Sequence, residues 1–403
     1  MVIGIIGAGA SGMAAAIRAA ENPQNQVLLL ERQARVGRKL QATGNGRCNL
    51  TNLHALEGGY HGDGADFWRY ALEQYPPETV LAWFRSLGLM TVAEPSGRVY
   101  PFSDQANSVV DVLRFALEKP NIRLLAGTEV TRVKRNGSGF RLETAEEAYL
   151  CDRLIAACGG LAGSKLGGGM SGYQILRGLG HRCTKLRPNL VQIRTDWPGV
   201  ASLKGVRAEC AGKIYRDETL FAEGTGEIQF TEMGLSGPMM FALSRDVCRE
   251  KGNWVCVLDL LPILSEEELL EALRQRRETA LPNGELLTGI LHNRLGRVLV
   301  QACGFSLMGR AQDLPDYALE ELAQKVKHFP VHLTEPLGMD SAQVTAGGIV
   351  TEEFDCTTME SKLVPGLYAC GEVLDVDGDC GGYNLQWAWA SGLLAGKNAG
   401  GNK

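Results

Sequence analysis

A glycine-rich turn near the start of the chain restricts the possible folds more than any other feature of the sequence. A short apolar run, 2–6, leads into Gly7-x-Gly9-x-x-Gly12, and an alanine-rich segment with helical character follows. A second apolar run, 27–30, then ends at Glu31, whose carboxylate suits the hydroxyls of a ribose. Strand, turn, helix, strand and terminal acid in this order are typical of a dinucleotide-binding Rossmann unit.

Each glycine of this turn has its own steric role. Gly7 permits the tight turn, Gly9 lets the backbone approach a pyrophosphate, and Gly12 lets the helix pack closely on the strand. The helix start at Ala10 and Ser11 presents free N–H groups and the positive end of the helix dipole to the phosphates. We therefore expect a dinucleotide to bind at this turn.

The end of the chain complements its beginning. The segments 366–372 and 381–386 look like the returning strand and helix with which many flavoproteins close over the flavin ring. A nicotinamide-only dehydrogenase has no use for them, so we expect the dinucleotide to be FAD. A helix N-terminus beside N1 and C2=O would stabilise the negative charge of reduced flavin. The expected contacts are Gly371, Glu372, Gly382, Asn384 and Leu385.

The segment 37–52 alternates glycines with Thr, Asn and Arg, which suits a backbone lying against a polar ligand. Because it comes soon after the ribose-binding acid, we expect it to run along FAD towards the flavin, with Lys39 and Arg47 neutralising pyrophosphate charge. The alternative is a surface loop with chance Asn-Gly turns. The expected contacts after Glu31 are Arg32, Lys39, Thr43, Gly44, Asn45, Gly46, Arg47, Cys48 and Asn49.

A further glycine pattern has a different interpretation. Gly167, Gly169 and Gly172 have the same spacing as the first turn, but no strand precedes them and no acid-terminated strand follows. We interpret them as a flexible glycine loop lining the site. The sequence therefore shows no second Rossmann domain for NAD(P)H.

The run from Gly37-Arg38-Lys39 to Thr43-Gly44-Asn45-Gly46-Arg47-Cys48-Asn49 resembles the signature of the bacterial BaiN/YhiN-type flavoproteins, described as NAD(P)/FAD-dependent oxidoreductases. The segments 230–238, 344–349 and 371–378 match in the same order, so the resemblance spans nearly the whole chain. It implies a Rossmann-type FAD-binding domain of the two-dinucleotide-binding class, an α/β fold interrupted by a β-barrel-like domain with a small helical insert. It also implies that Val130 lies beside the adenine. Two further expected contacts, at the end of an apolar strand, are Gly159 and Gly160.

These features predict the following domain plan. The FAD-binding domain would comprise 1–189 and 343–403. Between them would lie a β-rich inserted domain, 190–261 with a return at 329–342. A helical insert would occupy 262–328, its first helix starting with a capping box at Ser265 and Glu268. In the β-rich domain we expect strands at 190–194, 206–214, 227–230, 254–258 and 331–333.

Composition limits the classes of partner. The net charge of −5 and the lack of a long basic run argue against nucleic acid or an anionic membrane as the main partner. No apolar run reaches about 20 residues, so we expect no membrane span. The use of cysteine favours a cytoplasmic protein. Eleven cysteines without a Cys-x-x-Cys pair suggest reduced core residues rather than a disulfide relay. The histidines form no ligand-spaced pair on one helix, so we expect no metal, and the oligomeric state stays open.

The predicted activity is hydride transfer from NAD(P)H through FAD to a small or steroid-like organic acceptor. One alternative is an amine oxidase of the aminoacetone type that uses O₂, because the resembled family is linked to both bile-acid-type C=C reduction and aminoacetone oxidation. Others are an RNA-modifying flavoprotein and a flavin binder without turnover. No catalytic residue is assigned; Tyr100, Tyr383 and Arg47 are candidate proton donors or anion anchors. Cys48 invites a redox role, but without a nearby partner cysteine we favour a structural one.

Overall fold

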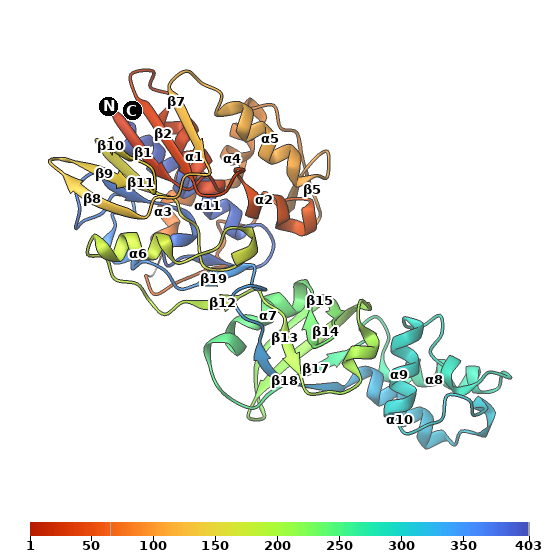
Figure 1. Cartoon of the computed structure of the whole chain (residues 1–403). Helices are drawn as coiled ribbons and strands as arrows, with labels where there is room; N and C mark the ends of the chain where they lie inside the picture. The colour runs from red at the N-terminus through yellow and green to blue at the C-terminus, as the bar shows by residue number, and fades with distance from the viewer. Residues whose placement is uncertain (65, 402–403) are drawn as a thin grey trace. The chain divides into compact units, whose positions relative to one another are not determined.

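The structure, a computed structural model, describes residues 1–64 and 66–401. The chain forms two compact units. Unit 1 comprises Met1–Pro188 and Ala342–Lys403, and unit 2 comprises Asn189–Ser341. Unit 1 is thus assembled from both ends of the chain, whereas unit 2 is continuous (Figure 1).

A parallel five-stranded sheet forms the centre of unit 1 (Figure 1). Its order is β20-β11-β1-β2-β7. The chain moves outward from β1 on one side and later continues on the other, so a topological switch point lies at the carboxyl ends of β1 and β11. This is the predicted Rossmann-type fold. The strands are β1 (Val2–Ile6), β2 (Gln26–Glu31), β7 (Ile122–Ala126), β11 (Arg153–Ala156) and β20 (Leu367–Ala369).

Two helices from opposite ends of the chain pack against each other beside this sheet. They are α1 (Ala10–Ala19) and α11 (Tyr383–Ala399). A Cβ atom on Gly392 would overlap the carbonyl oxygen of Ser11, and one on Gly396 would overlap that of Ala15. Glycines four residues apart therefore let the two helix backbones approach directly, and the small residues of α1 keep it buried on nearly every side.

Smaller elements complete unit 1. The antiparallel sheets are β8 (Arg132–Asn136) with β9 (Gly139–Glu143) and β10 (Ala148–Cys151), and β3 (Thr51–Asn52) with β6 (Arg98–Pro101) and β5 (Thr91–Ala93). The pairs are β4 (Tyr60–His61) with β21 (Asp377–Gly378), and β12 (Arg187–Asn189) with β19 (Val344–Ala346). The helices are α2 (Arg38–Ala42), α3 (Phe67–Gln74), α4 (Pro77–Ser86), α5 (Ala106–Ala116) and α6 (Ser171–Gly178).

Unit 2 contains a closed six-stranded barrel in the order β13-β16-β15-β14-β17-β18. Because the barrel is closed, it has no edge strand with unpaired backbone N–H and C=O groups. The predicted barrel is confirmed. Its strands are β13 (Ile193–Thr195), β14 (Arg207–Arg216), β15 (Thr219–Phe230), β16 (Gly234–Ser236), β17 (Trp254–Asp259) and β18 (Phe329–Pro336).

The helices of unit 2 include a predicted group and one that the sequence did not indicate. The former are α8 (Glu266–Arg277), α9 (Asn293–Ala302) and α10 (Asp316–Lys327). The capping box is confirmed: Ser265 Oγ accepts from Glu268 N at 3.1 Å and Ser265 N donates to Glu268 Oε2 at 2.8 Å. The unpredicted helix is α7 (Pro238–Arg249). Strand boundaries also differ: β15 begins eight residues earlier than expected, and the positive φ of Leu190, 49°, breaks the predicted strand there.

In the part of the chain that the structure describes, none of the helices combines the length and the apolar composition that crossing a bilayer requires.

The α1–α11 contact predicts a specific sensitivity. Gly392→Ala places a methyl group against the backbone of Ser11 and should lower the free energy of unfolding by about 1–3 kcal/mol. Gly178→Ala is the matched control, because a Cβ there meets no atom within 4 Å at the end of α6; it should be neutral or slightly stabilising. Urea unfolding followed by circular dichroism measures both, and equal midpoints would contradict the contact.

Candidate functional site

The glycine turn lies at the switch point between β1 and β11. Gly7 has φ 102°, and a Cβ there would overlap the carbonyl oxygen of Ala157. A Cβ on Gly12 would overlap the carbonyl oxygen of Gly7. A Cβ on Gly9 or on Gly159, by contrast, would meet no atom within 4 Å. Gly7 and Gly12 are therefore needed for packing. Gly9 and Gly159 leave open space at the carboxyl ends of adjacent strands, where a pyrophosphate would approach.

The acid at the end of β2 is already engaged with the backbone. Glu31 Oε2 accepts from Ala8 N at 2.7 Å and Oε1 accepts from Gln33 N at 2.8 Å. These bonds hold the carboxylate against the glycine turn. Thr128 N donates to Glu31 O at 2.8 Å, which brings the segment containing the buried Val130 to the end of the same strand.

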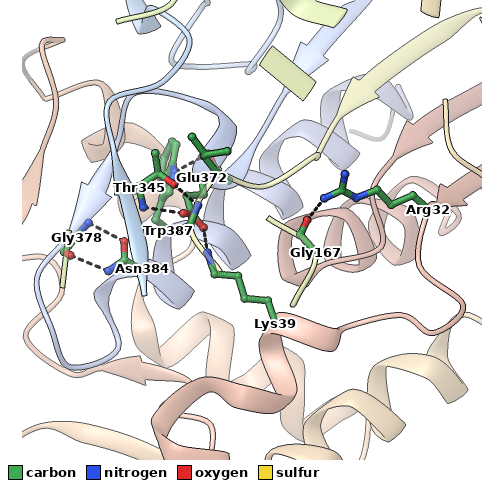
Figure 2. Close-up of polar contacts among 11 residues, drawn as sticks. Arg32, Lys39, Gly167, Thr345, Glu372, Gly378, Asn384 and Trp387 are labelled. Carbon is green, nitrogen blue, oxygen red and sulfur yellow. Dashed lines mark hydrogen bonds and ion pairs between the residues drawn. The ribbon is translucent and has the colours of Figure 1, made fainter. Parts of the chain in front are cut away.

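Arg32 connects three segments around this strand end. Its guanidinium donates to the carbonyl oxygen of Gly167 (Figure 2) and lies 3.8 Å from the Glu129 carboxylate. A Cβ on Gly169 would lie 2.8 Å from the same guanidinium. The backbone of the glycine loop 163–169 is thus bonded to Arg32. This close approach explains why Gly169, where a side chain would meet the guanidinium, is a glycine.

The loop predicted to run along the cofactor has strained backbone. Gly44, Asn45, Gly46 and Cys48 have φ values of 57°, 55°, 88° and 62°. Asn45 and Cys48 are not glycines, so each costs free energy in the left-handed region. Asn49 Oδ1 accepts from Val99 N at 3.3 Å, which joins the end of this loop to β6. Strain of this kind concentrates at ligand-binding segments, where the surroundings hold the backbone in place.

Cys48 faces the interior rather than a ligand. Its side chain is fully buried, and burial raises the pKa of the thiol to about 12. The group is therefore a neutral thiol throughout the physiological range. This supports the structural role for the side chain and leaves only its backbone to face a cofactor.

Arg47 is paired with carboxylates within the protein. Its guanidinium contacts Asp104 and, at 3.2 Å, Glu94, and it lies 3.9 Å from the ring centroid of Tyr100. These two acids already neutralise its charge. Arg47 therefore orders the loop against β6.

A partly buried polar network joins the two ends of the chain (Figure 2). Lys39 Nζ donates to Glu372 Oε2 at 2.7 Å, although the two residues are 333 positions apart. Glu372 Oε1 accepts from Thr345 N at 2.9 Å. The Thr345 hydroxyl oxygen accepts from the backbone N–H of Leu161 and of Ala162, both at 2.9 Å. A Cβ on Gly160 would overlap Glu372, so this glycine lets the carboxylate approach the end of β11.

The N-terminus of α11 is fixed by its own first turn (Figure 2). Asn384 Oδ1 accepts from Gly378 N at 2.8 Å, and Nδ2 donates to Gly378 O at 2.7 Å. Gly382 has φ 105° and packs against the backbone of Thr51. Leu385, which follows Asn384, is partly buried and packs against the hydrophobic core.

A second set of bonds connects α11 with the end of β20. Trp387 Nε1 donates to Gly371 O at 3.2 Å, and Gly371 N donates to Ser391 Oγ at 3.0 Å. Gly371 in turn packs against Ser11. Trp387 is buried, so it supports the site and does not stack on a ligand.

The structure also reveals polar residues that the sequence did not single out. Thr345, within the family motif 344–349, connects Glu372 to the loop after β11. His61 Nε2 lies 2.7 Å from Asp379 Oδ1, across the pairing of β4 with β21. Arg98, on β6, lies beside Gly381. The partners in these contacts are distant in the sequence, and no local spacing indicates them.

Ser361, His181 and Glu353 form a buried serine–histidine–acid cluster that resembles a hydrolytic triad but cannot act as one. Ser361 Oγ lies 3.0 Å from His181 Nε2, and His181 Nδ1 lies 2.9 Å from Glu353 Oε2. Ser361 Oγ also accepts from the N–H groups of Leu363 and Val364, so both of its lone pairs are occupied and it is no nucleophile. Burial lowers the pKa of His181, which is therefore neutral at pH 7. The cluster is structural.

Taken together, these segments fit FAD in unit 1. Open positions at Gly9 and Gly159, an acid at the end of β2, a strained polar loop and a glycine-led helix N-terminus surround the switch point of a Rossmann sheet. The structure brings 7–12, 37–49, 159–160, 371–372 and 382–385 together. The class defined by this fold and site is the Rossmann-type FAD-dependent oxidoreductases.

The comparisons give the family. Residues 1–398 match the HI0933-like protein Rossmann domain, and the chain belongs to this flavoprotein family. It is 38% identical over 403 residues to a protein of Clostridium scindens named 3-dehydro-bile acid delta(4,6)-reductase, covering 98% of each chain. It is 31% identical over 397 residues to a ribosomal RNA dihydrouridine synthase of Escherichia coli, covering 96% of this chain and 95% of that one.

A solved structure agrees with the fold. The 3-ketosteroid delta1-dehydrogenase of Sterolibacterium denitrificans, in complex with 1,4-androstadiene-3,17-dione, aligns with a TM-score of 0.52. The alignment covers 100% of this chain and 99% of that one at 13% identity. At this identity the likeness concerns the fold alone.

The position of Glu31 predicts its contribution to cofactor affinity. Glu31→Ala should weaken FAD binding by about 1–3 kcal/mol, because it removes charged acceptors from the ribose and frees two backbone N–H groups. Fluorescence titration of the apoprotein with FAD measures the change. Glu146→Ala, at an exposed position in unit 1, is the control. Unchanged affinity in the Glu31 variant would remove this carboxylate from the cofactor site.

The burial of Cys48 leads to a prediction for the absorbance spectrum of the flavin. Because its pKa is raised to about 12, no thiolate forms as pH rises towards about 10, and oxidised protein should show no long-wavelength thiolate-to-flavin absorbance. Cys48→Ser should retain FAD and most of its reduction rate. A band that appears with rising pH in the wild type and is absent from the variant would show a redox-active thiol instead.

Proposed function

We propose that the protein transfers hydride from NAD(P)H through FAD to a carbon–carbon double bond conjugated with a carbonyl group in a small or steroid-like acceptor. The observation that carries the proposal is the full-length similarity to a bile acid reductase, with 38% identity over 403 residues. All segments expected to bind FAD belong to unit 1. Bound FAD supplies the hydride acceptor and donor, and the protein supplies orientation and electrostatics.

The residues of unit 1 have separate tasks in this scheme. Glu31 and the glycine turn bind the adenosine ribose and pyrophosphate. The Lys39–Glu372–Thr345 network holds α2, β19 and the β11 loop in one arrangement around the phosphates and ribityl chain. The N-terminus of α11 would lie beside the flavin, where its dipole would favour the reduced, negatively charged state.

A second candidate function is reduction of uridine in ribosomal RNA, because relatives in E. coli and Haemophilus influenzae, at 31% and 29% identity, carry that name. RNA binding depends strongly on basic groups that neutralise phosphates. Unit 2 contains sixteen Lys and Arg against twenty-two Asp and Glu. Several of its arginines also pair with acids, as Arg277 does with Asp316 and Arg297 with Glu285. This charge balance favours a small-molecule acceptor and no nucleic-acid partner.

An anaerobic reductant screen tests the donor. The FAD-loaded protein should lose its oxidised flavin absorbance with NADH or NADPH, and should not be reduced by aminoacetone or related amines. Reduction by an amine alone would favour the oxidase, since hydride would then enter from the organic substrate.

Acceptor profiling tests the other half of the reaction. Reduced protein should be reoxidised without oxygen by conjugated enones, including 3-oxo steroids with a ring double bond, and not by their saturated ketones. Uridine-containing ribosomal RNA fragments serve as the competing substrate. Reoxidation by RNA in preference to every enone would replace the small-molecule proposal.

A further inference from the structure

We propose that Arg98 and Tyr100 form an oxygen-anchoring corner that binds the carbonyl group of the acceptor. The inference rests on the proposed function and adds to it the residues that hold the substrate. Both residues lie on β6, two positions apart, so their side chains leave the same face of the strand. Val99, between them, is buried on the other face.

Strand β6 lies where the two segments predicted to surround the flavin ring meet. A Cβ on Gly44, in the strained loop, would lie 3.5 Å from Tyr100 Cε1. A Cβ on Gly381, directly before α11, would lie 3.3 Å from Arg98 Nε. Asn52 Nδ2 donates to Gly381 O at 3.0 Å and fixes that turn against the β3–β6 pair. Arg98 and Tyr100 therefore leave one face of β6, and each lies against one of the two segments expected to surround the flavin ring.

Unlike Lys39, Arg32 and Arg47, Arg98 makes no ion pair or side-chain hydrogen bond with any of residues 1–64 and 66–401. Lys39 pairs with Glu372, Arg32 with Glu129, and Arg47 with Asp104 and Glu94. Glu94 N donates to Arg98 O across the hairpin, yet the Glu94 carboxylate contacts Arg47. A half-buried guanidinium without a counterion is costly unless a ligand supplies one.

Tyr100 supplies a second donor. The residue is 6% exposed, the Arg47 guanidinium lies over its ring, and its hydroxyl has no partner among the described residues. Burial, together with the nearby Glu94, raises the pKa of Tyr100, so the phenol stays protonated and remains a hydrogen-bond donor at neutral pH. A charged donor and a neutral donor on one strand face suit an oxygen that gains negative charge.

Reduction of a conjugated enone produces such an oxygen. Hydride adds to the β-carbon, the electrons of the double bond shift towards the carbonyl group, and the oxygen becomes an enolate. A proton from water then completes the α-carbon, so one hydride and one proton are consumed for each double bond saturated. The reductant is NAD(P)H, acting through FAD. Arg98 and Tyr100 stabilise the enolate oxygen, and Gly381 leaves room for it because any side chain there would contact the guanidinium.

The test uses the FAD-loaded protein and pentafluorophenol, which is a phenolate at neutral pH and imitates an enolate. The wild type should bind it with a long-wavelength charge-transfer absorbance. Arg98→Gln should weaken this binding at least about tenfold, Arg98→Lys by less, and Tyr100→Phe by about threefold, with FAD content unchanged. Arg132→Gln, on the exposed strand β8, is the matched control and should bind as the wild type does.

Enone kinetics separate the two levels of the proposal. If the wild type reduces enones and Arg98→Gln binds phenolate and enones within twofold of it, the corner is wrong and the proposed function stands. If the wild type reduces no enone but binds phenolate through Arg98, the proposed acceptor is wrong and the anchoring corner stands. If Arg98→Gln fails to hold FAD, the Arg98→Lys variant is used in its place. The inference is overturned if Arg98→Lys binds the phenolate as tightly as the wild type does. It is also overturned if the wild type binds no phenolate.

Discussion

Direct backbone-to-backbone contact is the constraint on which unit 1 depends. The carbonyl oxygen of Gly7 occupies the place of a side chain on Gly12, and that of Ala157 occupies the place of one on Gly7. On the other side of α1, Gly392 and Gly396 allow the backbone of α11 to lie against Ser11 and Ala15. These contacts set the separation of strand, turn and helix, and therefore the size of the opening that a pyrophosphate must fit.

The sequence predicted the elements whose signals are local. The glycine turn with its acid, and the capping box at Ser265, are short patterns with a single physical meaning, and both are found in the structure. The start of β15 was missed because the preceding turn has positive φ at Asp217 and Glu218, where glycine or asparagine is the usual signal. Helix α7 was not predicted: only its first residue, Pro238, lies in the family motif 230–238, and no helix was expected in the residues that follow.

The site was predicted as a set of segments and not as a set of bonds. The sequence indicated Arg47 as an anion anchor and did not indicate Arg98, yet Arg47 has two carboxylate partners and Arg98 has none among the described residues. Lys39 was expected to face phosphate and is paired with Glu372, and Glu31 already accepts two backbone N–H groups. Partner choice between distant charges depends on tertiary packing, which spacing along a chain does not encode.

The division of unit 1 between the two ends of the chain has a consequence for synthesis on the ribosome. Gly7 to Gly12 emerge first, but Gly371 and α11, which complete the same opening, follow roughly 360 residues later, about 20–70 s at ordinary elongation rates. The continuous unit 2 is released whole during this interval and is free to fold on its own. The N-terminal strand and helix cannot complete this opening until α11 has been synthesised, so we expect FAD to bind only after that point.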